Sequence, residues 1–174
     1  MLTGTLLLRW YNYLMNSVIV LRGPSGVGKS TISHLIQEKL GKNWTVIDVD
    51  KFKHYMPMKD GQSNRAERSK IAHDVSKFFT KQMYDKGYNV ILEEMYKKTY
   101  NDAVVEFLET NNMQYLKVYL HAPIDLAVER AKAREKEVPD DEIRRHFSEI
   151  EPYVDDFVID TTKYSSKEAV LFLR

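Results

Sequence analysis

Short runs of consecutive apolar residues alternate along this chain with longer segments in which apolar residues recur at helical spacing. The first run, residues 17–21 (SVIVL), is rich in β-branched residues, a pattern typical of a strand buried on both faces. The same pattern predicts further strands over residues 44–49, 89–92, 115–120 and 157–159.

The segments between these runs predict helices. They cover residues 29–40, 65–86, 99–110 and 123–137, with further helices after Pro139 and after Ser165. Thr99 with Asp102, and Ser165 with Glu168, have the spacing of a helix capping box. Residues 51–64 are polar and contain helix-breaking residues, so they predict an irregular segment.

Strands that alternate with helices of this length predict right-handed βαβ units. We therefore expect an α/β fold with three layers, α/β/α, around a central, mostly parallel five-stranded sheet. Ligands of such sheets bind beyond the carboxyl ends of the strands. The loops that could form a site are those that follow Leu21, Val49, Leu92, Leu120 and Ile159.

The composition excludes several kinds of chemistry. The chain has 174 residues, the size of one domain, and a net charge of +1, so nothing global indicates a polyanionic partner. It contains no cysteine, which excludes disulfides, thiolate metal sites and cysteine nucleophiles. The absence of cysteine fits a reducing compartment, and we expect a cytoplasmic protein.

The N-terminal segment is apolar and aromatic but is interrupted by polar residues. It is too short to span a bilayer and lacks the basic start and the cleavage site of a signal peptide. Two interpretations stay open: an extra segment that packs on the domain, or translated sequence upstream of a start at Met15. We favour an appendage without chemistry over residues 1–16, a single domain over residues 17–174, and no membrane contact.

A glycine-rich stretch follows the first predicted strand directly and matches the phosphate-loop pattern G-x-x-x-x-G-K-[ST]. The glycines let the backbone curl so that its N–H groups point at an anion, and the next helix adds its positive end. Lys29 supplies a charge for the β- and γ-phosphates, and the Ser30 hydroxyl is suited to ligate Mg²⁺. A chain of average composition would contain this pattern by chance less than ~1% of the time. We therefore expect ATP and Mg²⁺ as cofactors, bound by Gly23, Ser25, Gly26, Val27, Gly28, Lys29, Ser30 and Thr31.

A phosphate loop alone does not separate kinases from other nucleotide-binding proteins. A GTPase needs the guanine-reading pattern N-K-x-D, which occurs nowhere in the sequence. An AAA-type motor needs a longer domain and a strand ending in Asp-Glu, whereas residues 89–92 are followed by Glu93-Glu94, a partial match. The small size therefore favours a kinase, while the choice between ATP and GTP stays open.

Two aspartates, Asp48 and Asp50, end the second predicted strand. A carboxylate at this edge faces the γ-phosphate and can take a proton from an acceptor hydroxyl, although both residues could simply begin the next loop. Residues 17–162 resemble the small P-loop kinases grouped with polynucleotide 5′-kinases, zeta-toxin kinases and chloramphenicol phosphotransferase. In that group the aspartate of a D-x-x-R pattern is the general base and its arginine helps to hold the acceptor. The resemblance implies that Asp50 is the base, with Lys53 in the arginine's place but without the arginine's two-pronged grip.

The resemblance extends to a short helical lid after the fourth strand. Arg130 and Arg134 lie one helical turn apart there. In the group, lid arginines close over the phosphates and neutralise charge in the transition state, which implies a catalytic role for these two. A solvated basic face is the alternative, because Lys132 and Lys136 lie close by.

The acceptor is expected to bind near residues 51–70, which carry six basic and two acidic residues. We expect Lys53, Arg65 and Glu93 to contact it, although Glu93 could instead hold Mg²⁺ through a water or be a solvated loop carboxylate. A basic rim would suit an anionic acceptor, and a solvated helix face is the alternative. The five histidines lack metal-ligand spacing and are interpreted as structural or surface residues.

The sequence thus predicts transfer of the ATP γ-phosphate to a hydroxyl acceptor, with a nucleic-acid 5′-hydroxyl or a nucleotide preferred. A small-metabolite or antibiotic kinase is the first alternative. The second is a non-catalytic regulatory protein that binds a nucleotide. The sequence predicts neither the identity of the acceptor nor the oligomeric state.

Overall fold

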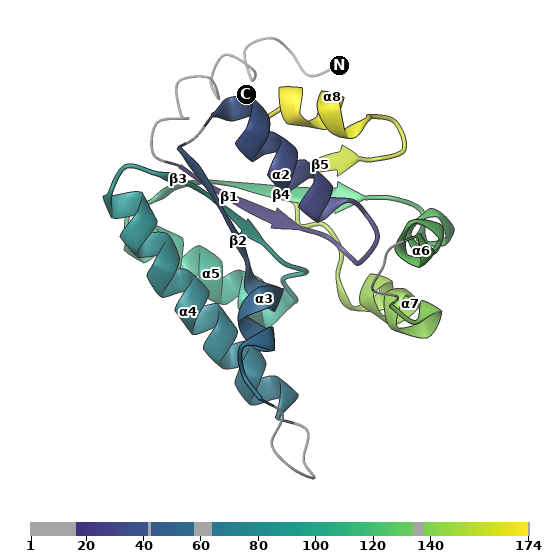
Figure 1. The fold of residues 1–174 in the computed structure, drawn as a ribbon, viewed down its shortest axis with the longest axis horizontal. Helices are drawn as coiled ribbons and strands as arrows, with labels where there is room; N and C mark the ends of the chain where they lie inside the picture. The colour runs from purple at the N-terminus through teal and green to yellow at the C-terminus, as the bar shows by residue number, and fades with distance from the viewer. Residues whose placement is uncertain (1–16, 42, 58–63, 134–137, 174) are drawn as a thin grey trace.

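The computed structural model describes residues 17–41, 43–57, 64–133 and 138–173, which fold around one parallel sheet (Figure 1). The strands lie in the order β2-β3-β1-β4-β5, and every neighbouring pair is parallel. The strands are β1 (Ser17–Arg22), β2 (Trp44–Asp48), β3 (Asn89–Glu93), β4 (Gln114–His121) and β5 (Phe157–Asp160). The predicted five-stranded α/β/α fold is confirmed.

Different helices cover the two faces of the sheet. The helices are α2 (Lys29–Leu40), α3 (Val49–His54), α4 (Arg65–Asp85), α5 (Lys98–Thr110), α6 (Ile124–Lys132), α7 (Asp140–Glu149) and α8 (Ser166–Leu171). Helices α2 and α8 lie on one face, and α4 and α5 on the other (Figure 1). Because side chains alternate along a strand, Ile19 and Leu21 of β1 pack in the core under α2 and α8. Val18 and Val20 pack in the second core, under α4 and α5.

Helices α6 and α7 lie beyond the carboxyl ends of the central strands, and α6 is the helix predicted to be the lid (Figure 1). They begin after Pro123 and Pro139, as the sequence predicts. Val128 of α6 packs against Ile143 of α7, which joins the two helices through a small apolar cluster of their own.

Helix α3 is an element that the sequence reading missed. An irregular segment is predicted from residue 51, but residues Val49–His54 are helical. The side chain of Asp48 accepts the backbone N–H of Asp50 at 3.1 Å, so the end of β2 caps the new helix. Asp50 therefore lies in the first turn of a helix rather than in a loop.

One of the two predicted capping boxes is formed and the other is not. Ser165 and Glu168 exchange the expected hydrogen bonds at the start of α8. The second prediction is wrong, because α5 begins at Lys98, one residue before Thr99, and Asp102 pairs with the Lys98 ammonium at 3.0 Å.

A buried ion pair joins the end of β1 to the chain segment that leads into β5. Arg22 is fully buried, and its guanidinium donates to the Asp156 carboxylate and, at 2.9 Å, to the carbonyl oxygen of Glu151. The guanidinium also lies 4.2 Å from the centre of the Tyr153 ring. These contacts fix the strand that leads into the glycine-rich loop.

Two expectations concern the ends of the chain and the membrane. The expected appendage, residues 1–16, lies outside the described residues. Within the described part of the chain, none of the helices combines the length and the apolar character that crossing a membrane requires.

Candidate active site

The glycine-rich loop connects the central strand β1 to α2 and depends on glycine at defined positions. Gly23, Gly26 and Gly28 have φ angles of 146°, 86° and 100°. A Cβ atom on Gly26 would lie 2.2 Å from the carbonyl oxygen of Ala127, and one on Gly23 would lie 2.6 Å from that of Leu120. Only glycine therefore lets the loop pass so close to the neighbouring backbone.

The loop and the start of α2 together form a site suited to an anion. The N-cap residue of α2 is Gly28, which has no side chain to cap the helix, and the first turn holds no acidic residue. The Lys29 ammonium donates to the carbonyl oxygens of Gly23 and Pro24, at 3.0 and 3.1 Å, and so lies across the loop. The Val27 side chain is buried in the core, so this residue can offer only its backbone to a ligand.

Glu93 ends β3 beside the start of α2. Its carboxylate accepts the hydroxyl of Ser30 and, at 2.6 Å, the hydroxyl of Ser33. Glu93 is only 4% exposed. It is therefore not a solvated loop carboxylate, which was one of the three roles that the sequence left open for it. Asp48 pairs with Glu93 in the sheet register, and burial together with the charge of Glu93 raises the pKa of Asp48.

The Ser30 hydroxyl and the Glu93 carboxylate fit a magnesium ion that also binds phosphate. Hydroxyl and carboxylate oxygens are ligands that Mg²⁺ prefers. Among the described residues no three metal-binding side chains form a cluster of their own. A Mg²⁺ ion at Ser30 would therefore take most of its other ligands from phosphate oxygens and water.

Arg130 borders a cavity of about 320 Å³ on the α8 side of the glycine-rich loop, here called the Thr161 cavity. This cavity is lined by Gly26, Val27, Gly28, Thr31, Arg130, Thr161, Tyr164, Ser165 and Ser166. The Arg130 guanidinium donates to the hydroxyl and carbonyl oxygens of Thr161, at 2.9 and 3.1 Å. Its role in the transition state stays a prediction, and Arg134 lies outside the described residues.

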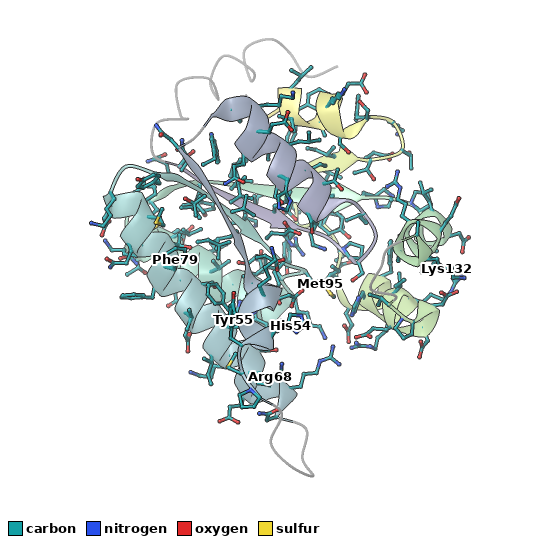
Figure 2. The ribbon with its side chains drawn as sticks, viewed as in Figure 1. His54, Tyr55, Arg68, Phe79, Met95 and Lys132 are labelled. Atoms are coloured by element: carbon teal, nitrogen blue, oxygen red, sulfur yellow. The ribbon has the colours of Figure 1, made fainter. Side chains whose placement is uncertain are left out.

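A larger cavity of about 680 Å³ lies between α3, α4 and α7 and is here called the α3–α7 cavity. Its lining residues are Ser25, Asp50, Lys53, His54, Arg65, Ala66, Ser69, Glu94, Met95, Lys97, Tyr100, Val138, Glu142 and His146. His54 and Met95, both labelled in Figure 2, line it from α3 and from the segment after β3. Ser25 and Asp50 both border this cavity, so the phosphate loop and the expected base face one space.

Lys53 joins Asp50 to a buried carboxylate. Its ammonium donates to Asp50 Oδ1 at 2.7 Å and to Glu94 Oε1 at 2.8 Å. Burial by itself lowers the pKa of Lys53, but the charges of Glu94 and Asp50 outweigh burial and raise it. Burial likewise tends to raise the pKa of Glu94, but the nearby His73 ring and the Lys53 charge lower it to about 2. Glu94 is therefore ionised throughout the neutral range.

The sequence predictions gave no role in the site to Glu94 and His146, which line this cavity, or to His73, which contacts Glu94. His73 Nε2 lies 3.2 Å from Glu94 Oε2, and His146 Nδ1 lies 2.9 Å from the hydroxyl of Ser25. Burial lowers the pKa of His146, which keeps its ring neutral at pH 7. Neither histidine belongs to a local motif, and 121 positions separate His146 from Ser25, so no sequence signal identified them.

The expected basic rim is balanced by acidic residues of α7. Arg65 pairs with Glu142 at 3.2 Å, and Lys97 pairs with Glu149 at 2.7 Å. These contacts also connect α7 to α4 and to the segment after β3. The cations around the α3–α7 cavity therefore lie beside carboxylates instead of forming an uncompensated positive surface.

Comparisons with known structures agree with this fold. The chain is similar to the tunicamycin resistance protein of Deinococcus radiodurans (16% identity, TM-score 0.69, covering 90% of this chain and 92% of that one). It is also similar to an APS kinase of Mycobacterium tuberculosis in complex with AMPPNP and APS (16%, TM-score 0.67, 89% and 93%). A gluconokinase of Sinorhizobium meliloti is a further similar structure (18%, TM-score 0.64, 91% and 91%).

At these identities the similarity shows a kinase-like P-loop fold. No curated protein sequence is significantly similar to the chain. The family model described as Zeta toxin matches residues 15–161, which is most of the sequence. The chain therefore belongs to the zeta toxin family.

Proposed function

We propose that this protein is an ATP-dependent kinase that transfers the γ-phosphate of ATP to a hydroxyl group of an acceptor in the α3–α7 cavity. One observation carries the proposal: Ser25 of the phosphate loop and the carboxylate of Asp50 line the same cavity. A phosphate held by the loop and a hydroxyl held at Asp50 would therefore meet in one space. The nucleoside part of ATP would occupy the Thr161 cavity, next to Arg130.

The chain's own residues would supply binding, orientation and proton transfer. The loop amides and the Lys29 ammonium would hold the β- and γ-phosphates, which repel an incoming hydroxyl unless their charge is compensated. Asp50 would accept the proton of the acceptor hydroxyl while that oxygen forms a bond to the γ-phosphorus. The bond between this phosphorus and the β,γ-bridging oxygen breaks, and ADP leaves with that oxygen. When bound, Mg²⁺ at Ser30 supplies additional positive charge to the phosphates.

The acceptor class that the geometry supports best is a small hydroxyl-bearing molecule. A volume of about 680 Å³ lies within the range of small-molecule sites. The basic residues near the cavity led us to prefer a nucleic-acid end or a nucleotide as the acceptor. Arg65 pairs with Glu142 and Lys97 pairs with Glu149, so these charges are compensated and the case for an anionic acceptor is weaker. A small-metabolite or antibiotic kinase is therefore the form of the proposal that we favour.

A transfer assay with [γ-³²P]ATP tests the proposal. Wild-type protein is incubated with Mg²⁺ and, in parallel, with sugars, nucleosides, aminoglycosides and a 5′-hydroxyl oligonucleotide. Lys29→Ala is the matched control for contaminating kinases. We expect a labelled product from at least one small hydroxyl compound with the wild type alone. ATP binding without turnover across the whole panel would support the regulatory-protein alternative and contradict the kinase.

A further inference from the structure

Lys53 occupies the position where the resemblance expects an acceptor-binding arginine, but both of its strong contacts are internal. Its ammonium donates to Asp50, one turn earlier in α3, and to Glu94, which directly follows β3. The Asp50 side chain is 57% exposed, whereas that of Glu94 is 7% exposed. An exposed ion pair within one helix is weak on its own and does not fix a long lysine side chain. The buried partner, Glu94, therefore determines where the ammonium lies.

Glu94 is itself held from its other side. Its Oε2 accepts the backbone N–H of Tyr96 at 3.2 Å and lies 3.2 Å from Nε2 of His73. The His73 ring stacks on Tyr100, with ring centres 3.8 Å apart and an angle of 10° between the planes. Tyr96 is fully buried and has a φ angle of 51°, a backbone conformation that non-glycine residues rarely adopt. This strained backbone points the N–H of Tyr96 at the Glu94 carboxylate. Strained backbone conformations are common next to functional groups.

We propose that Glu94 and His73 are positioning residues for the phosphoryl transfer, which act through Lys53 to fix the carboxylate of Asp50. This inference rests on the proposed function, because it assigns roles within the same reaction. Lys53 then serves to orient the base and does not grip the acceptor. Its single charge faces two carboxylates, so this part of the cavity disfavours a phosphate group on the acceptor next to the reacting hydroxyl.

Steady-state hydrolysis of MgATP tests the catalytic part, with water as the probe that takes the place of the acceptor hydroxyl. Glu94→Gln keeps the shape of the side chain but removes its charge, and we expect kcat to fall about 10- to 100-fold with little change in the KM for ATP. Asp74→Asn is the matched control, since this α4 carboxylate pairs with Lys70 and does not line the cavity. An unchanged kcat in Glu94→Gln, or a rise confined to KM, would overturn the proposal.

Two further variants separate positioning from a merely structural role. Lys53→Arg still carries donors for both carboxylates and should keep most of kcat, whereas Lys53→Met should lose it. If Glu94 acts through Lys53, adding Glu94→Gln to Lys53→Met should lower kcat no further. Independent losses that multiply in the double variant would show that Glu94 acts by another route. His73→Phe, which keeps the ring over Tyr100, should lower kcat about 3- to 10-fold.

A readout that does not need turnover distinguishes this inference from the proposed function. The Lys53 ammonium should give a slowly exchanging ¹H–¹⁵N NMR signal, assigned by its loss in Lys53→Arg. We expect the signal to disappear in Glu94→Gln and to persist in Asp74→Asn. If the Lys53 signal persists in Glu94→Gln, the proposed positioning of Lys53 by Glu94 is wrong, even if the kinase is active. If the wild type shows the Lys53 signal but never hydrolyses ATP or transfers phosphate, the proposed function is wrong instead.

Discussion

Replacing Glu94 by glutamine should destabilise the fold by an amount that depends on pH. The pKa of this buried carboxyl is about 2 in the folded protein, against an ordinary value of 4.5. A difference of this size corresponds to about 3 kcal/mol of folding free energy at pH 7. Because the folded pKa is the lower one, this contribution is complete above pH 4.5 and is lost as the pH falls through 2.

Urea unfolding at pH 7 and pH 3, followed by the fluorescence of the buried Trp44, measures this effect. Glutamine resembles the protonated acid, so Glu94→Gln should be less stable than the wild type by about 3 kcal/mol at pH 7 and by about 1 kcal/mol at pH 3. Asp74→Asn, which removes an exposed carboxylate from α4, should change stability by less than about 1 kcal/mol at either pH. The same loss at both pH values would indicate a packing defect and refute the electrostatic reasoning.

Three further predictions concern the nucleotide and the base. Asp50→Asn should lower kcat by about 10²- to 10⁴-fold, while titration with a fluorescent ATP analogue shows unchanged affinity; full activity would exclude Asp50 as the base. In Gly26→Ala the new Cβ would lie 2.2 Å from the Ala127 carbonyl oxygen, so calorimetry should show ATP binding weakened at least about 10-fold, and wild-type affinity would contradict the loop geometry. Arg130→Ala should raise the KM for ATP about 10-fold in steady-state assays, because Arg130 lines the Thr161 cavity, and an unchanged KM would place the nucleoside elsewhere.

The parts of the site that the sequence predicts well are those built from neighbouring residues. The loop from Gly23 to Ser30 is a continuous stretch, and the strand before it and the helix after it have clear periodicity. The fold follows from the same local patterns, because short buried strands that alternate with helices leave few arrangements other than a parallel sheet. Helix α3 was missed because it is short and depends on one capping side chain, Asp48.

The rest of the site depends on contacts between distant residues. The sequence predicts that Lys53 binds the acceptor. Only the fold shows that its ammonium contacts Glu94, which lies 41 positions away in the chain. The basic residues of 51–70 likewise suggest a positive surface until the acidic residues of α7 are placed opposite Arg65. Single-sequence patterns do not contain this information, because they record neither which loops meet nor which charges cancel.

The buried contact between Arg22 and Asp156 limits how this molecule can evolve and move. Losing Asp156 alone would leave the Arg22 guanidinium as an uncompensated charge in the interior, at a cost of about 3–5 kcal/mol, so position 156 should change only together with position 22. The contact also links the strand that enters the phosphate loop to the strand that leads to Thr161. The two ends of the nucleotide site should therefore behave as one rigid body, which leaves induced fit to helices α6 and α7.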